Sequence, residues 1–515
     1  MSPMAKTIMV QGTGSSVGKS LLVTALCRIL RQDGHDVAPF KAQNMSLNSH
    51  VTPGGAEIGR SQAVQAEAAG VLPVGEMNPI LLKPEMDYRS QLVVMGRPVG
   101  VLESRNFNRR KDGLWEVVAS SLDSLRSQFD VVVIEGAGSP AEINLRRGDI
   151  VNMEVALYAG APVLLAADID KGGVFASVYG TVLLLAPEER ELLRGVIINK
   201  FRGDVSILKP GLRQLEDLTG VPVTGVVPYF RDIYIPEEDS PATQNSLEGP
   251  TDKTLIDIAV LALPHIANFD DFDSFKREVG VSLRYVGTLD ELGEPDLLII
   301  PGTKTTVADL KHLRETGIAA RLPYLAGHGI AIIGICGGYQ MMGRLIRDPL
   351  RVESDQERVP GLGLLPVVTE FFPRKRTHLV SGSVLAGTGL LQGSEGLSFD
   401  GYEIHMGDTV ADRSDAGATP EPALRLMRRS GREIDVGDGH TSPDGWIIGT
   451  YVHGLFHNEE LRRGILKQVA VRKGVNLQFD EDTFSQSREY DKLADLVRHS
   501  LDMDAVYETI GLTRD

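Results

Sequence analysis

The stretch AIIGICGGYQ, residues 331–340, ends an apolar segment on a cysteine. A short apolar run bounded by turn-forming residues is typical of a strand buried in a parallel sheet. Cys336 follows this run between Gly334 and the pair Gly337 and Gly338, so the chain can turn sharply from strand into helix. A side chain at such a turn stands close to backbone N–H groups that can stabilise an oxyanion. The pattern predicts a nucleophilic cysteine on an α/β fold.

The alternative interpretation of Cys336 is inert packing, because cysteine is among the residue types most often buried. Cys27 fits that interpretation, since it lies on the apolar side of a helix predicted within residues 21–30. A candidate base distinguishes Cys336: the apolar segment GWIIGTYVHGLF, residues 445–456, brings His453 to the end of another predicted strand. Because a thiol needs a base or a nearby cation to become a thiolate, we predict Cys336 as the nucleophile and His453 as its base.

These two segments, together with PDLLIIPGTK at residues 295–304, resemble the class I glutamine amidotransferases. That family hydrolyses glutamine through a glutamyl thioester and releases ammonia. The resemblance implies a set of oxyanion-binding and glutamine-binding residues, which here are Gly302, Gly337, Gln340 and His405. For His405, which lies in GYEIHMG at residues 401–407, a structural histidine at a strand end is the alternative.

One position departs from the family pattern. Class I amidotransferases usually carry a glutamate two residues after the histidine, and this chain has Leu455 there. The cobalamin-pathway branch of the family also lacks this acid, so a Cys336–His453 dyad is expected. The sequence leaves open which group orients His453.

The composition is that of a multidomain globular protein. A chain of 515 residues exceeds the size at which single hydrophobic cores stop growing, and 42% of its residues are hydrophobic. A formal charge of −16 disfavours nucleic-acid and anionic-membrane partners. Two cysteines provide neither a disulfide framework nor a cysteine-based metal site, which fits a reducing cytoplasm. The N-terminal residues lack the pattern of an export signal, and no apolar run reaches membrane-spanning length.

KTIMVQGTGSSVGKSLLVTALCRIL, residues 6–30, predicts a strand, a glycine-rich turn and a helix. Such a turn closes backbone N–H groups around phosphate oxygens, while its GKS ending supplies a lysine for the terminal phosphates and a hydroxyl for magnesium. A glycine-rich turn without a ligand is the alternative, which the coincidence of strand, GKS and helix disfavours. The spacing resembles that of dethiobiotin synthetase and its relatives, ATP enzymes that activate carboxylates. The predicted nucleotide-binding residues are Gly12, Thr13, Gly14, Ser15, Val17, Gly18, Lys19 and Ser20.

Other residues of the N-terminal half are predicted to complete this site. Glu135 ends the apolar strand FDVVVIEGAG, the placement of a carboxylate that holds magnesium with Ser20. Glu57 is a further metal candidate, for which an exposed acid in the first turn of a helix is the alternative. We predict that Lys41 contacts phosphate or carboxylate and that Asn199 lies near the nucleotide base.

The match becomes close at PFKAQNMSLNS, residues 39–49, which resembles the signature of the cobyric acid synthase family. Further matching segments are spread over most of the chain: IEGAGSPAEINL (134–145), ADIDKGGVFAS (167–177), INKFRGD (198–204), LPHIANFDDFD (263–273) and GYEIHMG (401–407). The resemblance implies an ATP- and glutamine-dependent enzyme that amidates the b, d, e and g carboxylates of adenosylcobyrinic acid a,c-diamide. Because a free carboxylate is a poor electrophile, ATP would first convert it to an acyl phosphate.

Two doubly wound α/β domains are expected. Alternating strands and helices across residues 6–230 predict a mostly parallel sheet covered on both faces. A second α/β unit of flavodoxin-like, class I amidotransferase type follows an acidic, proline-containing stretch. The predicted boundaries are 1–235 for the ATP-dependent amidoligase domain, 236–251 for the linker, 252–458 for the amidotransferase domain and 459–515 for a helical extension packed on the body.

Two other functions remain open at this point. A sibling amidoligase, such as cobyrinic acid a,c-diamide synthase or a cell-wall amidating enzyme, shares both domains and differs in its acceptor. A P-loop regulatory ATPase with a vestigial amidotransferase domain is the second, and intact Cys336 and His453 count against it. The expected partners are small molecules (corrinoid, glutamine, ATP and Mg²⁺), with no nucleic acid and no membrane.

Overall fold

A computed structural model of the chain describes residues 4–86, 88–103, 111–146, 148–236, 238, 253–412, 421–480 and 484–513. The chain forms two compact units: the first comprises Met1–Ser46, Ala56–Glu238 and Phe484–Asp515, and the second comprises Leu47–Gly55 and Asp239–Thr483. The units are not divided at the predicted boundaries. Residues 47–55 of the N-terminal half belong to the second unit, and the C-terminal residues from 484 onward belong to the first.

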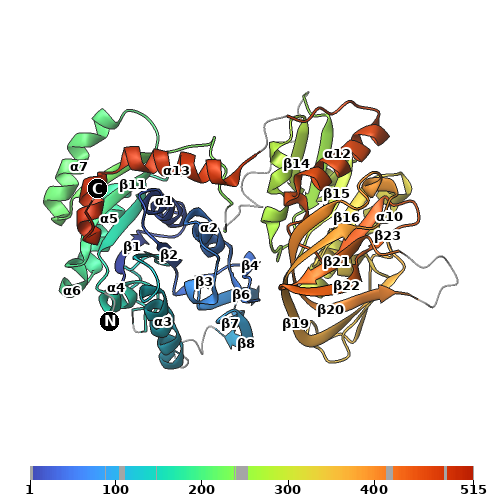
Figure 1. Ribbon diagram of the computed structural model, residues 1–515, viewed down its shortest axis with the longest axis horizontal. Helices are drawn as coiled ribbons and strands as arrows, with labels where there is room; N and C mark the ends of the chain where they lie inside the picture. The colour runs from blue at the N-terminus through green and yellow to red at the C-terminus, as the bar shows by residue number, and fades with distance from the viewer. Residues whose placement is uncertain are drawn as a thin grey trace. The chain divides into compact units, whose positions relative to one another are not determined.

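The first unit is built on a six-stranded parallel sheet in the order β12-β11-β10-β1-β9-β2 (Figure 1). Along β1, Ile8 and Val10 pack in one hydrophobic cluster and Met9 in another, because successive side chains of a strand point to opposite faces. The predicted parallel sheet with both faces covered is therefore confirmed. The strands are β1 (Lys6–Gly12), β2 (Val37–Phe40), β9 (Val131–Glu135), β10 (Val163–Asp168), β11 (Leu193–Phe201) and β12 (Val223–Pro228).

Helices from both ends of the chain cover this sheet. One face packs against α1 (Lys19–Gln32), α13 (Gln486–Ser500) and α14 (Met503–Ile510). The other packs against α3 (Lys111–Arg126), α4 (Met153–Ala159), α5 (Val174–Leu184) and α7 (Val205–Thr219). Figure 1 shows α13 beside α1, and an ion pair of 2.8 Å joins Arg28 to Asp491. The C-terminal helices thus complete the core of the unit that begins the chain.

Smaller elements of the first unit lie between β2 and α3. A four-stranded sheet in the order β3-β6-β7-β8 comprises β3 (Gln43–Met45), β6 (Ile80–Met86), β7 (Arg89–Val94) and β8 (Arg97–Glu103). Between β3 and β6 the chain forms β5 (Glu57–Gly59), α2 (Arg60–Ala68) and a 3₁₀ turn η1 (Gly75–Met77). A short helix α6 (Pro187–Arg190) precedes β11.

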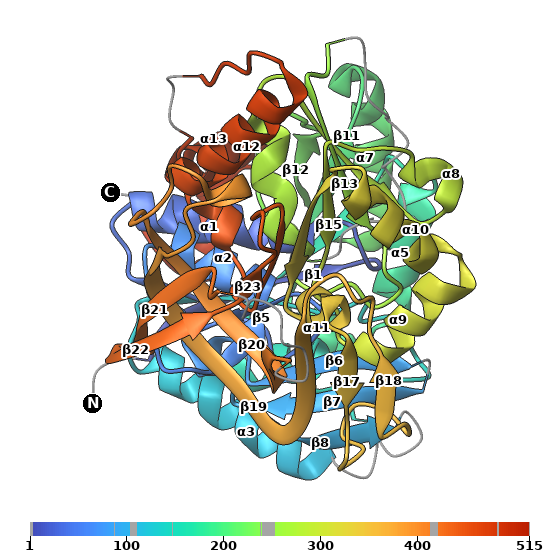
Figure 2. The ribbon, with the colours of Figure 1, turned by 90° about the vertical axis from the view of Figure 1, so that its right-hand side faces the viewer.

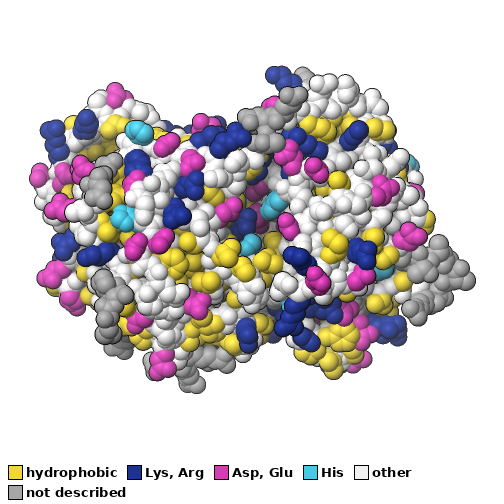
Figure 3. Space-filling model, viewed as in Figure 1, with side chains coloured by type: hydrophobic (Ala, Val, Ile, Leu, Met, Phe, Trp, Pro, Cys, Tyr) yellow, Lys and Arg dark blue, Asp and Glu magenta, His cyan; other side chains and the backbone are white. Residues whose placement is uncertain are grey.

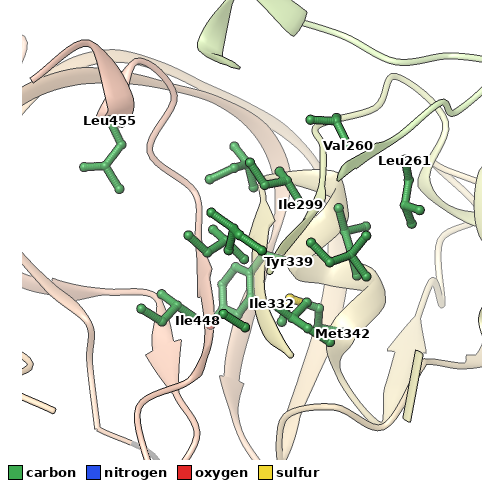
Figure 4. Packing of buried hydrophobic residues seen from close by; sticks show 14 of the residues in the cluster. Val260, Leu261, Ile299, Ile332, Tyr339, Met342, Ile448 and Leu455 are labelled. Atoms are coloured by element: carbon green, nitrogen blue, oxygen red, sulfur yellow. The ribbon is translucent and has the colours of Figure 1, made fainter. Parts of the chain in front are cut away.

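The second unit contains another α/β sheet, in the order β14-β13-β15-β16-β24-β23, parallel except for the β23–β24 pair. Its strands are β13 (Ile256–Leu261), β14 (Val281–Val286), β15 (Leu297–Ile300), β16 (Ala331–Ile335), β23 (His440–Thr441) and β24 (Ile447–Thr450). Its helices are α8 (Leu289–Leu292), α9 (Thr306–Glu315), α10 (Ile318–Gly327), α11 (Gly337–Met342) and α12 (Glu459–Lys473). Figure 4 shows Ile299, Ile332 and Ile448 of three neighbouring strands packed with Tyr339 and Met342 of α11. The predicted α/β fold class is confirmed.

A mostly antiparallel sheet was not predicted in this unit. It runs β18-β17-β19-β21-β22, and β20 pairs with β19. The long strands β19 (Val367–Val384) and β20 (Ser398–Ala411) lie side by side in Figure 2, and the short β4 (Ser49–Val51) lies against both. The remaining elements are β17 (Leu345–Arg347), β18 (Arg358–Pro360), β21 (Leu424–Arg429), β22 (Arg432–Asp438) and the 3₁₀ segments η3 (Phe269–Arg277), η4 (Gly389–Leu391) and η5 (Leu455–His457).

The surface shows mixed charge. Figure 3 shows acidic and basic side chains interspersed across the visible face. In the part of the chain that the structure describes, no helix is both long and apolar enough to cross a bilayer.

Candidate active sites

The glycine-rich turn of the first unit joins β1 to α1 in a conformation that needs its glycines. Gly18 has a φ of 97°, and a side chain there would collide with Asn199. A side chain at Gly12 would meet Val17 Cγ2 at 2.6 Å. Ser16 also has a positive φ, of 58°. The turn is therefore held in one shape at the N-terminus of a 14-residue helix, where a phosphate group is favoured.

Lys19 and Ser20 occupy the first turn of α1. The Lys19 ammonium donates hydrogen bonds to the carbonyl oxygens of Gly14 (2.9 Å) and Gly138 (3.1 Å). The Ser20 hydroxyl donates to Glu135 Oε1 at 2.8 Å. The structure thus brings together the lysine, the hydroxyl and the strand-end carboxylate that the sequence predicted as one site.

Glu135 accepts from three side chains. Besides Ser20, Lys41 Nζ contacts its Oε1 at 2.8 Å and Gln65 Nε2 contacts its Oε2 at 2.5 Å. Burial alone would raise the pKa of Glu135, but the charge of Lys41 and these hydrogen bonds hold it below its usual value. The carboxylate is therefore ionised although it is 1% exposed, as a ligand of a divalent cation must be.

Glu238 lies in the same cluster, and sequence reasoning missed it. Its carboxylate accepts from Asn44 Nδ2 at 2.6 Å and from the Ser61 hydroxyl at 2.7 Å, and it lies 3.8 Å from Lys41 Nζ. Its side chain is 7% exposed. Glu238 falls within the predicted linker, where it is one of several acids, so no local pattern distinguishes it.

Glu57 and Asn199, two further predicted residues, have other partners. The fully buried carboxylate of Glu57 forms an ion pair of 2.7 Å with Lys83, so a metal ion would have to displace that lysine. Asn199 donates its side-chain amide to the Val17 carbonyl at 2.8 Å and thereby supports the glycine-rich turn. Among the residues that the structure describes, no group of three or more His, Cys, Asp or Glu side chains is arranged to hold a metal.

The other residues of the turn differ in exposure. Thr13 donates its backbone N–H to Ala166 at 2.9 Å, which joins the turn to β10. Ser15 is exposed and Val17 is buried. Close to the turn, a cavity of about 210 Å³ is lined by residues that include Gln43, Gly138 and Arg146.

In the second unit, Cys336 stands alone between β16 and α11. Its φ of 50° and ψ of −107° are unusual for a residue with a side chain, and such strain occurs at functional turns. The backbone N–H donates to Thr450 O at 2.8 Å, which ties the turn to β24. Sγ lies 3.5 Å from Ile404 O. The strand, sharp turn and helix predicted around this thiol are confirmed.

His453 follows β24 and is held on two sides. Its Nδ1 lies 2.7 Å from Asp271 Oδ2, and its ring stacks on Tyr402 with centroids 5.2 Å apart. Burial lowers the pKa of His453, but the charge and hydrogen bond of Asp271 and its interaction with Cys336 outweigh this and raise it to about 10. The imidazole is therefore a cation beside the thiol, the environment that favours a thiolate.

Asp271 is positioned to orient His453, a role for which the sequence, with Leu455 in place of the usual glutamate, indicated no residue. It lies on η3, and its second oxygen accepts from the Gly454 N–H at 2.8 Å, so both carboxylate oxygens are fixed. The residue belongs to the segment LPHIANFDDFD that carried the family resemblance. Its separation of 182 residues from His453 hides the pairing from any local pattern.

The predicted oxyanion and glutamine residues surround this pair. A side chain at Gly302 would meet His453 Cε1 at 2.9 Å, and one at Gly337 would meet Thr303 Cγ2 at 2.6 Å, so both turns need glycine. The side-chain oxygen of Gln340 accepts from Thr306 at 2.9 Å and its amide donates to Met406 O at 2.8 Å. Through these contacts Gln340 stabilises the turn at Cys336.

His405 is buried beside the same turn. Its Nδ1 lies 3.0 Å from Gly407 O and its ring stacks on Tyr451 with centroids 3.8 Å apart. Its Nε2 lies 3.9 Å from Glu403, a carboxylate that Arg429 contacts through both oxygens at 2.9 Å.

Comparison with known proteins covers both units. Family models match at residues 8–242 (CobQ/CobB/MinD/ParA nucleotide binding domain) and 257–461 (CobB/CobQ-like glutamine amidotransferase domain). The chain is 49% identical over 511 residues to a cobyric acid synthase of Dehalococcoides mccartyi, 48% over 514 residues to one of Moorella thermoacetica and 49% over 517 residues to one of Pelotomaculum thermopropionicum. Each alignment covers 99% of this chain and 99%, 98% and 97% of the respective relative.

Proposed function

The chain belongs to the cobyric acid synthase family, and from this premise we propose that it amidates the b, d, e and g carboxylates of adenosylcobyrinic acid a,c-diamide with ATP and glutamine. One observation carries the proposal. A single chain holds an ionised carboxylate and two lysines around a phosphate-binding turn and, separately, a thiol beside a protonated histidine. The similarity of the named relatives over their whole length favours this acceptor over those of sibling amidoligases.

The second unit releases ammonia. The Cys336 thiolate attacks the side-chain amide carbon of glutamine, and the carbon–nitrogen bond breaks as the protonated His453 gives its proton to the leaving nitrogen. Water then hydrolyses the thioester to glutamate and restores the thiol. Asp271 holds His453 through Nδ1, so Nε2 is left for the proton transfer. Backbone N–H groups at Gly302 and Gly337 stabilise the oxyanion of each tetrahedral intermediate.

The first unit activates the acid. The turn at residues 12–20 binds the triphosphate of ATP, and an oxygen of the substrate carboxylate attacks the γ-phosphorus while the bond to ADP breaks. Ammonia attacks the acyl phosphate, and phosphate leaves as the amide forms. Lys19 and Lys41 neutralise the charge that develops on the phosphoryl oxygens.

Ser20 and Glu135 would hold Mg²⁺, which when bound neutralises phosphate charge. The ionised state of Glu135, although it is buried, fits this role. Lys41 occupies a cation position on the same carboxylate, so it would move toward the phosphates when the ion binds. The cavity beside Gly138 adjoins the carbonyl that Lys19 contacts, and we assign it to the acceptor.

We propose that the enzyme acts in the reducing cytoplasm, because the mechanism needs Cys336 as a free thiol. Both cysteines are unpaired in the structure. Cys27, fully buried, has its pKa raised by burial and by Glu135, which removes it as a competing nucleophile.

The proposal is tested by incubating the full chain with ATP, Mg²⁺, glutamine and the corrinoid diamide and following the corrinoid by mass spectrometry. We expect stepwise replacement of hydroxyl by amino groups, with one glutamate and one phosphate released per amide. ATP turnover without corrinoid amidation would instead indicate the regulatory ATPase. In a parallel incubation with cobyrinic acid, amidation of that acid but not of the diamide would indicate the sibling synthase.

A further inference from the structure

The first turn of α9 packs directly against the turn that carries Cys336. A side chain at Gly337 would meet the Thr303 backbone nitrogen at 3.1 Å and Thr306 Oγ1 at 3.2 Å. Thr306 also donates its hydroxyl to the side-chain oxygen of Gln340 in α11 at 2.9 Å. The residues that begin α9 are therefore immediate neighbours of the thiol turn.

Glu353 reaches the same turn of α9 from the loop between β17 and β18. Its Oε1 accepts from the Val307 N–H at 3.3 Å, and Val307 follows directly on Thr306. Asp348 shapes this loop, because its carboxylate accepts from the backbone N–H groups of residues 352–354, each at 2.8 Å. The carboxyl of Glu353 is thus held beside the start of α9.

Lys304 brings a positive charge to the same place. It ends the segment PDLLIIPGTK shortly after Gly302, and its backbone N–H donates to His265 O at 3.0 Å. Burial raises the pKa of Glu353 to about 7, and the charge of Lys304 opposes this rise. The two side chains therefore lie close enough for their charges to interact.

The Thr305 hydroxyl adds a polar group next to Lys304. Thr305 is the N-cap residue of α9, but its side chain makes no capping hydrogen bond. In the part of the chain that the structure describes, this hydroxyl oxygen is buried and has no hydrogen-bond partner. A buried hydroxyl without a partner is costly, and a bound molecule that accepts its hydrogen bond would remove that cost.

Another acid of α9 already has partners within the protein. Asp309 Oδ1 lies 2.7 Å from His265 Nδ1, and its Oδ2 accepts from the Thr303 hydroxyl. Asp309 thereby fixes the segment around Gly302. Glu353 is the acid beside this turn to which we assign a ligand.

Free glutamine carries an α-ammonium and an α-carboxylate group a few bonds from the carboxamide that Cys336 attacks. We infer that Glu353 binds the α-ammonium group of glutamine and that Lys304 and the Thr305 hydroxyl bind its α-carboxylate. These contacts distinguish free glutamine from a glutamine residue within a peptide, which has neither charge. The inference rests on the proposed hydrolysis of glutamine by the second unit and concerns that unit alone.

The first test uses two reagents that alkylate Cys336. The reagent 6-diazo-5-oxo-L-norleucine carries both α-groups of glutamine, and iodoacetamide carries neither. In the full-length protein, Glu353→Gln should slow labelling by the diazo compound by about tenfold to a hundredfold, the effect of losing a hydrogen bond to a charged group. Labelling by iodoacetamide should stay within about twofold. The substituted amide keeps an oxygen for the Val307 N–H, so the contact with α9 remains.

Two glutamine analogues separate the two charges. Glutaramate lacks the α-ammonium group, and γ-aminobutyramide lacks the α-carboxylate. Glu353→Gln should lower kcat/KM of ammonia release from glutamine and from γ-aminobutyramide, chiefly through KM, and leave that for glutaramate within about twofold. Lys304→Met should show the reverse pattern, a loss with glutamine and glutaramate and none with γ-aminobutyramide.

Glu357→Gln and Lys311→Met are the matched controls. Glu357 is an exposed acid of the same loop, paired with Arg351 at 3.1 Å, and Lys311 is an exposed base of α9. Neither control should change the labelling rates or the analogue pattern. Ammonium-supported amidation should stay within about twofold of the wild type in all four variants, because the first unit is unchanged.

The inference is overturned if Glu353→Gln slows both reagents equally, since Glu353 would then act through the thiol turn, or if it slows neither. Equal losses with glutamine and glutaramate in this variant would also contradict it. Equal losses with glutamine and γ-aminobutyramide in Lys304→Met would remove Lys304 from the assignment. A wild type that releases no glutamate from glutamine would contradict the proposed function, whereas normal glutamine use by Glu353→Gln would refute only the role given to Glu353.

Discussion

The two functional turns of the molecule both connect a parallel strand to a helix, yet they differ in length. In the first unit, residues 13–18 separate β1 from α1. In the second, Cys336 alone separates β16 from α11. Each contains a non-glycine residue with positive φ, 58° at Ser16 and 50° at Cys336. The longer turn has enough backbone N–H groups to surround a phosphate, whereas the shorter one presents a single side chain.

The turns also differ in how their partners are held. Lys41 lies between two carboxylates, at 2.8 Å from Glu135 and 3.8 Å from Glu238, so it has a second counter-ion if its contact with one of them is lost. Among the residues that the structure describes, His453 forms an ion pair with Asp271 alone, and both oxygens of Asp271 are fixed by hydrogen bonds. The phosphoryl site is thus arranged for exchange of partners, and the thiol site for a fixed geometry.

Cys336→Ala is expected to cause the largest difference between glutamine-supported and ammonium-supported amidation. Glutamine-supported amidation should fall by more than ~10³-fold, because no other group can form the thioester. Ammonium-supported amidation should persist, since the first unit is unchanged. Initial rates of ADP and amide formation with glutamine or ammonium chloride measure both.

Cys27→Ala is the matched control, because this thiol lies in the core of the first unit, and it should leave the ratio of the two rates unchanged. Equal loss of both activities in Cys336→Ala would show that the thiol is structural. The two turns would then not serve separate reactions.

Asp271→Asn should have the next largest effect. It removes the charge that holds His453 in position, so glutamine-supported amidation should drop by roughly 10²- to 10⁴-fold, the range seen when the orienting acid of a catalytic histidine is neutralised. Ammonium-supported amidation should again be retained. A glutamine-supported rate within about twofold of the wild type would contradict the role given to Asp271.

The same variant has a defined pH signature. Asp271 raises the pKa of His453 to about 10, so the pair stabilises the fold fully below the unfolded-state value of about 6.5 and this contribution is lost as the pH rises through about 10. Thermal unfolding should therefore show Asp271→Asn less stable than the wild type at pH 6, with the difference shrinking as the pH rises from about 6.5 to about 10. A constant difference across this range would show that Asp271 acts through packing.

Glu238→Gln should have the smallest effect and should act on the other turn. Lys41 would lose its second counter-ion, which costs about 1 kcal/mol or five- to tenfold in rate, with glutamine and ammonium affected alike. Mg²⁺ titration followed by tryptophan fluorescence or calorimetry should show altered affinity in the nucleotide complex.

Asp232→Asn makes the same charge change on an exposed residue of the same segment and should leave both rates and the Mg²⁺ titration unchanged. A glutamine-specific loss in Glu238→Gln would place this residue with the thiol site instead.

Local patterns were sufficient to predict the two turns. The strand, glycines and helix around Lys19 and around Cys336 are contiguous in sequence, so the hydrophobic pattern of each segment predicts them. The pairing of Ser20 with Glu135 followed because the turn leading to Ser20 begins at the carboxyl end of β1, and Glu135 ends the neighbouring parallel strand β9.

The missed residues depend on distant partners. Asp271 and Glu238 each contact residues far away in the chain, and no local sequence pattern indicates such a contact. The long strand β19 was missed because its central residues are exposed or half-buried and show no alternation. Glu57 stays a predicted metal candidate, and its ion pair with Lys83 joins two residues that no local pattern relates.

The central claim is that the second unit releases ammonia from glutamine and that the first unit incorporates this ammonia into the corrinoid amide. Supplying glutamine labelled with ¹⁵N in its side-chain amide, together with ATP, Mg²⁺ and the corrinoid diamide, and analysing the product by mass spectrometry tests it most directly. We expect ¹⁵N in each new corrinoid amide for the wild type and none for Cys336→Ala. Labelled ammonia released into solution with no ¹⁵N in the corrinoid, while ATP is consumed, would contradict it.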